Sequence, residues 1–254
     1  MISTIVMDLD GTLPRSDKTI SDYTVDVLHK CQAAGIKIVF ATARSIQAAK
    51  EHIERIGPDY FIGFGGSLVL QPMTSLTIRR FDIPAEVADS LIKECLETPT
   101  ITGIHASNEV IALSNNLLPN MQHYRITDFA HEQGNRYLKI SVDASASADV
   151  ERIAAHFSMC DLLKYTGEDL YRFAHRDAIK WKAVQAIAEY ERSDTARFVA
   201  FGDDINDLEM IQHCGIGVAM QNAIPQVQAV AQNICASNDE DGVARLISEH
   251  VLRL

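Results

Sequence analysis

The sequence lacks any long uninterrupted hydrophobic run and is poor in basic residues. No apolar stretch approaches the roughly eighteen residues of a membrane-spanning helix, and the first residues contain no charged leader with an apolar stretch and cleavage site. With 34 acidic against 23 basic residues, the net charge of −11 disfavours non-specific binding to nucleic acid or anionic membranes. We expect a soluble protein that binds a small molecule, with no membrane and no obligate protein partner.

Paired cysteines are also missing. The five cysteines are odd in number, widely scattered and free of any C-x-x-C pair. This pattern excludes an obvious disulfide framework or zinc knuckle. We therefore expect a reduced, cytoplasmic setting.

Strand and helix signals alternate at both ends of the chain, and its 47% hydrophobic content is sufficient for a substantial core. The first part predicts strands at 2–7, 36–40 and 59–64 and helices at 21–34 and 45–56. The last third predicts a helix at 181–191, a strand at 197–201, and then further alternation that ends in a short strand. This pattern is typical of an α/β fold with a doubly wound, Rossmann-like parallel sheet.

The pattern changes between residues 84 and 176. Helices there are mixed with a hairpin at 104–113 and with short strands, which indicates an α+β insert. We predict a core formed by residues 1–83 and 177–254, interrupted by a second domain at 84–176.

Polar residues follow several of the predicted core strands. In open parallel sheets, ligands bind beyond the carboxyl ends of the strands. The residues at those positions are Asp8 and Asp10, then Thr42 and Arg44, then Asp203, Asp204, Asn206 and Asp207. Converging carboxylates raise one another's pKa unless a cation compensates. Mg²⁺, which prefers carboxylates, waters and a substrate phosphate, suits such a pocket and points to phosphoryl transfer.

Four short motifs resemble those of the haloacid dehalogenase superfamily of phosphohydrolases, and they occur in that family's order. They are D-L-D-G-T-L from Asp8, A-T-A-R around Thr42, the isolated Lys180, and G-D-D-I-N-D from Gly202. The insert between the second and third motifs, with G-V-A-M-Q-N-A and A-S-N-D-E-D-G-V-A-R-L near the end, is similar to the Cof-type branch. The resemblance covers essentially the whole chain and implies a phosphatase core with a large α+β cap domain.

The resemblance also implies a role for each matching residue. Asp8 would be the nucleophile that forms an aspartyl-phosphate, and Asp10 the general acid and base, with a pKa well above that of Asp8. Mg²⁺ would be held by the Asp8 side chain, the Asp10 backbone carbonyl and Asp203, with Asp207 in support. The groups around the phosphate would be Thr42, Lys180, Asn206 and the backbone N–H groups of Leu9 and Ala43, with Arg44 as a further supporting residue.

The chain departs from the family's pattern at three places. Ala43 replaces the usual Gly of the second motif, and Gly-Gly-Ser at 65–67 replaces Asn-Gly-Ala after the third strand. The third motif has Trp181 after Lys180 where a Gly is usual, and Lys182 is an alternative candidate for the site lysine. We expect Trp181 to pack under the cap rather than to read the substrate.

The expected activity is hydrolysis of small phosphorylated metabolites, such as sugar phosphates. Two alternatives remain open. A phosphosugar mutase would need a second phosphate site rich in Arg and Lys in the insert. A regulatory protein that binds a phosphometabolite would need no acid/base residue at position 10.

Overall fold

The structure is a computed structural model that describes residues 1–107, 112–114, 125–126, 133–164 and 169–252. The chain forms two compact units. One, called here the core unit, contains Met1–Arg79 and Ile179–Leu254, and the other, called here the insert, contains Arg80–Ala178.

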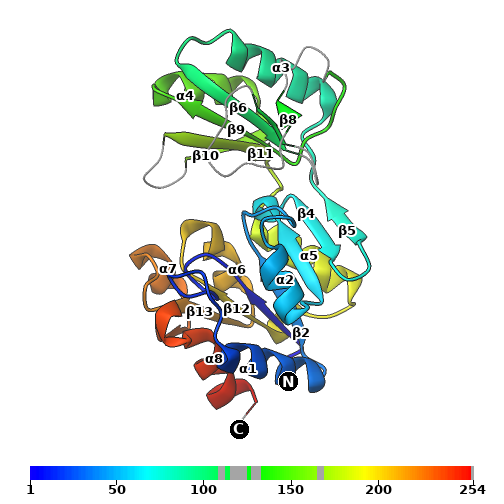
Figure 1. The fold of residues 1–254 in the computed structure, drawn as a ribbon, viewed down its shortest axis with the longest axis vertical. Helices are drawn as coiled ribbons and strands as arrows, with labels where there is room; N and C mark the ends of the chain where they lie inside the picture. The colour runs from blue at the N-terminus through cyan, green and yellow to red at the C-terminus, as the bar shows by residue number, and fades with distance from the viewer. Residues whose placement is uncertain (108–111, 115–124, 127–132, 165–168, 253–254) are drawn as a thin grey trace. The chain divides into compact units, whose positions relative to one another are not determined.

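The core unit is built on an eight-stranded sheet (Figure 1). Its order is β14-β13-β12-β1-β2-β3-β4-β5, and the strands from β14 to β3 in that order run parallel. The strands are β1 (Thr4–Met7), β2 (Lys37–Ala41), β3 (Tyr60–Gly63), β4 (Leu68–Gln71), β5 (Leu76–Arg80), β12 (Phe198–Gly202), β13 (Ile216–Met220) and β14 (Asn233–Cys235). Every residue of β1, β3 and β12 is buried, as expected for strands covered on both faces.

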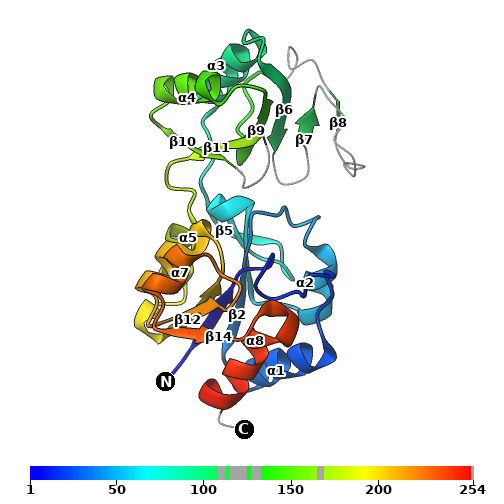
Figure 2. The ribbon, with the colours of Figure 1, turned by 90° about the vertical axis from the view of Figure 1, so that its left-hand side faces the viewer.

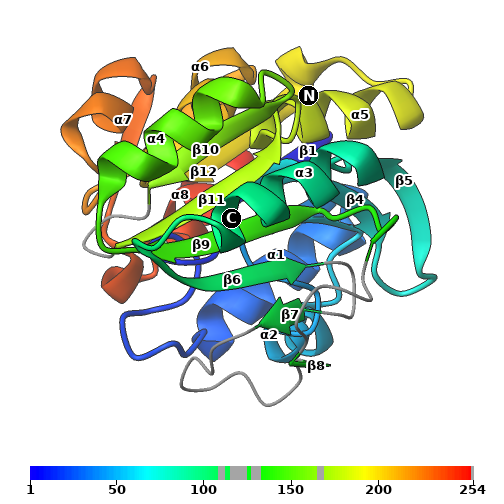
Figure 3. The ribbon, with the colours of Figure 1, turned by 90° about the horizontal axis from the view of Figure 1, so that it is seen from above.

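The helices of the core unit form two groups that cover the two faces of this sheet (Figure 3). In one, α1 (Asp22–Ala33) contacts α2 (Lys50–Ile56) and α8 (Gly242–Leu246). In the other, α6 (Leu208–His213) contacts α5 (Lys180–Tyr190) and α7 (Pro225–Val230). This is the doubly wound α/β architecture that the alternating pattern predicts.

Two elements differ from the sequence prediction. The helix expected from residue 45 begins only at Lys50, because Ser45 Oγ accepts from Ala48 N and the Lys50 N–H bonds to the carbonyl of Gln47, three residues back. At the other end, the sequence predicts a short strand as the last element. In the structure the last strand, β14, is followed by α8 and by a π-helical stretch at Ile247–Val251.

The insert is an α+β unit with a six-stranded sheet of order β10-β11-β9-β6-β7-β8. Its strands are β6 (Ile101–Ser107), β7 (Ala112–Ser114), β8 (Arg125–Ile126), β9 (Lys139–Ala144), β10 (Cys160–Lys164) and β11 (Leu170–His175). The helices α3 (Ala85–Leu96) and α4 (Ser147–His156) pack on one face (Figure 2). Alternate residues of β9, including Ile140 and Val142, join the apolar core beneath these helices.

The five cysteines are buried and free. In the described part of the chain, every helix is too short or too polar to cross a lipid bilayer.

Candidate active site

The central strands of the core sheet carry the predicted site residues at one edge. β1 lies between β12 and β2, and all three run parallel. Asp8 directly follows β1 and its backbone N–H bonds to the carbonyl of Phe201, while Thr42 follows β2 and Asp203 follows β12. Because the carboxyl ends of parallel strands lie at the same edge, the sheet brings these distant motifs together.

Lys180 connects two of the buried carboxylates. Its Nζ lies 2.6 Å from Asp8 Oδ1 and 2.6 Å from Asp207 Oδ1, and all three side chains are at least nine-tenths buried. Lys182 is exposed on the same helix. Of the two lysines, the structure therefore brings Lys180, the first residue of α5, into the carboxylate cluster.

The Gly-Gly-Ser turn after β3 positions the start of α5. Gly66 has φ +115°, and a Cβ atom there would lie 2.4 Å from the carbonyl carbon of Ile179, the residue before Lys180. The preceding Gly65 N–H bonds to the carbonyl of Thr42, which ties this turn to the end of β2. Ser67 is buried and its Oγ donates to the carbonyl of Phe64. The turn thus acts through its backbone rather than through an amide side chain.

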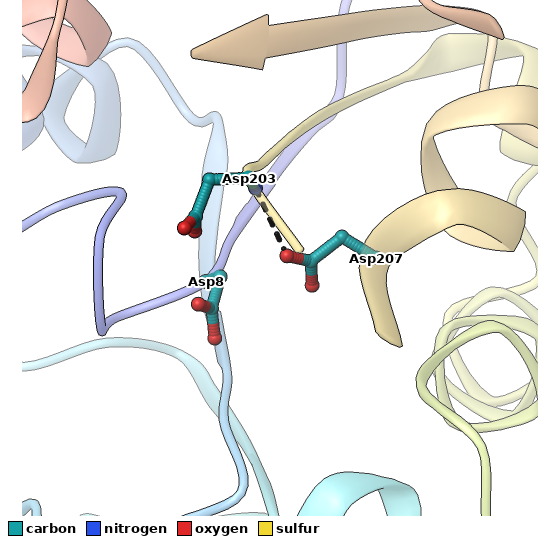
Figure 4. A group of neighbouring side chains, drawn as sticks. All are labelled: Asp8, Asp203 and Asp207. Carbon is teal, nitrogen blue, oxygen red and sulfur yellow. Dashed lines mark hydrogen bonds between the residues drawn. The ribbon is translucent and has the colours of Figure 1, made fainter. Parts of the chain in front are cut away.

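The third carboxylate, Asp203, lies beside Asp8 and Asp207 (Figure 4). One oxygen from each of the three lies within 4.8 Å of the others. Asp207 is fully buried, and its Oδ2 accepts from the backbone N–H groups of Asp203 and Asp204, at 3.0 and 3.2 Å. Lys180 donates to Oδ1, the other oxygen, so both carboxylate oxygens of Asp207 accept hydrogen bonds from protein groups.

The cluster holds more negative than positive charge, and burial acts together with these charges to shift the pKa values of Asp8, Asp203 and Lys180. Burial raises the pKa of Asp8 well above its usual range, with further increases from the charges of Asp207 and Asp203 that Lys180 only partly opposes. Burial, chiefly, raises the pKa of Asp203 to about 6. Burial lowers the pKa of Lys180, but Asp207 and Asp8 outweigh it, so the ammonium stays charged.

Asp10 is in a different environment. Arg44 donates to both of its carboxylate oxygens, and Lys18 Nζ lies 3.3 Å from Oδ1. Partial burial raises the pKa of Asp10, but the hydrogen bonds and charges of Arg44 and Lys18 hold it below its ordinary value. The expected order of the two pKa values is therefore reversed in this structure, because Asp8 is buried beside two carboxylates whereas Asp10 has two cationic partners.

The remaining predicted residues lie near these groups. Thr42 is buried and its Oγ1 accepts from the backbone N–H of Arg44, while the Leu9 side chain is fully buried in the core. Ala43 and Asn206 are both half-buried, and Asn206 lies in the short 3₁₀ turn between β12 and α6. The ring of Trp181 packs on His213 of α6 within the core unit, with centroids 5.3 Å apart.

Four contacts at the site involve residues that the sequence reasoning did not assign. Thr12 Oγ1 donates to Asp203 Oδ1 at 2.7 Å, and Lys18 pairs with Asp10. Asn222 and Asn238 hold the loop after β1, through the carbonyls of Gly11 and Pro14 respectively. The last two lie in the segments M-Q-N-A and S-N-D-E-D-G, which the resemblance had already marked. Their partners are more than 200 residues away in the chain, so spacing could not reveal the contacts.

Comparison with known proteins agrees with this geometry. The sequence profile of the haloacid dehalogenase-like hydrolase family matches residues 5–247. YxeH of Bacillus subtilis (strain 168) is 28% identical over 99% of both chains, and the 5-amino-6-(5-phospho-D-ribitylamino)uracil phosphatase YitU of that organism is 26% identical over 97% of this chain and 96% of its own. The solved structure of TM0651 from Thermotoga maritima has a TM-score of 0.87 at 22% identity, covering 98% of this chain and 97% of its own. The chain belongs to the haloacid dehalogenase-like hydrolase family, in its Cof-type branch, and is an enzyme of the phosphatase class.

Proposed function

We propose that this enzyme is a Mg²⁺-dependent phosphatase that hydrolyses small phosphorylated metabolites through an aspartyl-phosphate on Asp8. The observation that carries the proposal is the position of Asp8, which is buried at the end of β1, held by Lys180 and next to Asp203. A carboxylate fixed in this way can act as a nucleophile toward a phosphate that enters the same edge of the sheet.

The donor set fits a hard divalent cation. Three carboxylates share one buried ammonium, and burial, with a smaller effect of the neighbouring carboxylates, raises the pKa of Asp8 and Asp203. Both oxygens of Asp207 already have protein partners. Asp8 and Asp203 are therefore the carboxylates that would hold Mg²⁺, with Asp207 as support, and the family resemblance adds the Asp10 backbone carbonyl. When bound, the ion would offset the repulsion between the nucleophile and the phosphate dianion.

In the first step, an Asp8 carboxylate oxygen forms a bond to phosphorus while the ester oxygen leaves and takes a proton from Asp10. In the second step, water attacks the phosphorus of the aspartyl-phosphate and gives a proton to Asp10, which regenerates Asp8 and releases inorganic phosphate. Lys180 stabilises charge on the phosphoryl oxygens, together with Thr42, Asn206 and the N–H groups of Leu9 and Ala43.

Asp10 needs a proton for the first step, but Arg44 and Lys18 favour its charged form. We infer that the ion pair with Arg44 orients Asp10 before substrate binds, and that the pair loosens when an incoming phosphate attracts the guanidinium. Arg44 would then have a supporting role, as expected from its position two residues after Thr42.

The substrate class rests on two supports. The carboxylate cluster with Lys180, the one such group among the described residues, suits a single phosphoryl group, and the relative YitU is a 5-amino-6-(5-phospho-D-ribitylamino)uracil phosphatase. We therefore propose a small phosphate monoester, such as a sugar phosphate.

The test is release of inorganic phosphate from an aryl phosphate, followed by a panel of sugar, nucleotide and cofactor phosphates, with and without Mg²⁺. We expect turnover only with the metal. Asp8→Asn should abolish turnover while Mg²⁺ still binds, and Asp26→Asn, an exposed change on α1, should leave it unchanged.

Undiminished turnover in Asp8→Asn would refute the nucleophile assignment. Isomerisation of a sugar phosphate without phosphate release would indicate a mutase, and tight binding of a metabolite without turnover would indicate a regulatory protein.

A further inference from the structure

Asn222 joins three loops at the edge of the core sheet, in the turn that follows β13. Its Nδ2 donates to the carbonyl of Gly11 at 2.7 Å, and its Oδ1 accepts from the backbone N–H of Asn238 at 3.2 Å. The same Asn238 donates through its side chain to the carbonyl of Pro14. The loop after β1 is therefore held at two of its carbonyls, from the turn after β13 and from the segment after β14.

The part of the loop that Asn222 holds lies directly against Asp203. Gly11 has φ +80°, and a Cβ atom there would lie 2.3 Å from Asp203 Oδ2, so the carboxylate fills the space that a side chain would need. The next residue, Thr12, is buried and donates from Oγ1 to Asp203 Oδ1 at 2.7 Å. Gly11 thus packs directly against Oδ2 of the Asp203 carboxylate, and Thr12 orients Oδ1 through its hydrogen bond.

We propose that Asn222 is a positioning residue that acts through Gly11 and Thr12 to fix the orientation of the Asp203 carboxylate, and thereby sets the affinity of the site for Mg²⁺. This inference rests on the proposed function. Residues that orient metal ligands without touching the metal commonly change its affinity by about 10- to 100-fold. Asn222 does not contact the carboxylates itself, so its effect must pass through the loop.

A purely structural role for Asn222 predicts a different result. Its side chain is exposed, so its loss removes little buried apolar surface and two hydrogen bonds, one to the Gly11 carbonyl and one from the Asn238 N–H. Thermal stability would then fall slightly with no change in metal binding. The positioning role predicts a loss of Mg²⁺ affinity that is out of proportion to the loss of stability.

The experiment measures Mg²⁺ binding by isothermal titration calorimetry on the full chain, together with the melting temperature. Asn222→Ala and Thr12→Val should each weaken Mg²⁺ binding by about tenfold. Thr12→Ser, which keeps the hydroxyl donor, should restore it. Gln221→Ala is the matched control, because Gln221 is the exposed neighbour in the same turn and it accepts from Gln228 through its backbone carbonyl, which the substitution keeps.

The double variant Asn222→Ala/Thr12→Val gives the sharpest test. If both residues act on Asp203 through one loop, the loss of Mg²⁺ affinity in the double variant is smaller than the product of the two single losses. Independent effects would multiply.

Three outcomes separate this inference from the proposed function. If the unaltered protein binds no Mg²⁺, the proposed metal site fails and this inference fails with it. If the unaltered protein binds Mg²⁺ and folded Asn222→Ala binds it within about twofold as tightly, well short of the range for such residues, only this inference is overturned. If Asn222→Ala does not fold, Thr12→Val and Thr12→Ser decide: equal Mg²⁺ affinity in these two variants overturns the orienting role of the loop.

Discussion

The guanidinium of Arg44 holds both oxygens of the Asp10 carboxylate, with Nε 2.7 Å from Oδ2 and Nη2 2.5 Å from Oδ1. A fork of this kind fixes the orientation of a carboxylate more tightly than a single contact. Arg44 is itself oriented by the loop after β2, where its Nη1 lies 3.5 Å from the carbonyl of Ala48. The two residues lie in the loops that follow β1 and β2, so their pairing depends on the sheet that places these strands side by side.

Replacing Arg44 should affect substrates according to their leaving groups. Arg44→Gln leaves Asp10 less well oriented, and we expect kcat/KM for an alkyl phosphate, which needs leaving-group protonation, to fall by about tenfold or more. An aryl phosphate has a good leaving group and should change much less. Steady-state kinetics on the two substrates, with Arg55→Gln on α2 as the control, measures the difference. Equal losses for both substrates would contradict the role of Arg44 in orienting Asp10.

Removal of the buried ammonium should be costly for stability and activity. Lys180→Met leaves Asp8 and Asp207 buried without their shared cation, and we expect a loss of about 3 kcal/mol in the free energy of unfolding. Phosphatase activity should fall by about 100-fold or more.

The control for this change is Lys182→Met, an exposed substitution two residues further along α5, whose free energy of unfolding should stay within about 0.5 kcal/mol of that of the unaltered protein. Urea unfolding and phosphate release measure both effects. A larger loss of activity in Lys182→Met than in Lys180→Met would reassign the site lysine.

Gly66→Ala tests the close approach of the turn after β3 to Ile179. The substitution combines a positive φ with a Cβ placed 2.4 Å from backbone, and we expect a loss of about 2 kcal/mol or more. Gly35→Ala is the matched control, because Gly35 has φ +80° with nothing within 4 Å of its Cβ position. Gly35→Ala should reduce the free energy of unfolding by about 1 kcal/mol, which is the cost of the left-handed backbone conformation alone. Equal destabilisation of the two variants in thermal unfolding would show that the approach to Ile179 is not tight.

The ion pair of Arg15 with Asp241 should make stability depend on pH. Burial raises the pKa of Asp241, but Arg15 and neighbouring hydroxyls lower it by more, so it lies below its ordinary value. The charged carboxylate therefore stabilises the fold above the unfolded pKa of about 3.9, and this contribution is lost as pH falls through the folded value.

Asp241→Asn is a suitable variant here, since Asn also tolerates the left-handed conformation that this residue adopts, with φ 58°. We expect Asp241→Asn to be less stable than the unaltered protein at pH 7 and the difference to shrink below about pH 4. Unfolding in urea at several pH values measures this. A difference that stays constant from pH 7 to the lowest pH at which both proteins fold would refute the electrostatic explanation.

The sequence by itself determined the α/β class, the alternation of strands and helices in the core unit, and which polar residues follow its central strands. Buried strands such as β1 and β12 appear as mainly apolar runs, and each is followed by charged residues that end the run. The apolar run and the polar residues that end it are neighbours in the chain, so the sequence alone predicts where each strand ends. For this reason it predicts Asp8, Thr42 and Asp203 at strand ends.

Only the tertiary structure decided which charges pair and which carboxylate is held charged. The pairs Arg44 with Asp10, Thr12 with Asp203, and Lys180 with Asp8 join residues from separate strands and loops. A pKa depends on burial and on the charges within a few ångströms, and neither is a property of local sequence. For this reason the sequence could name Asp8 and Asp10 as a working pair, but the packing around each of them set the order of their pKa values.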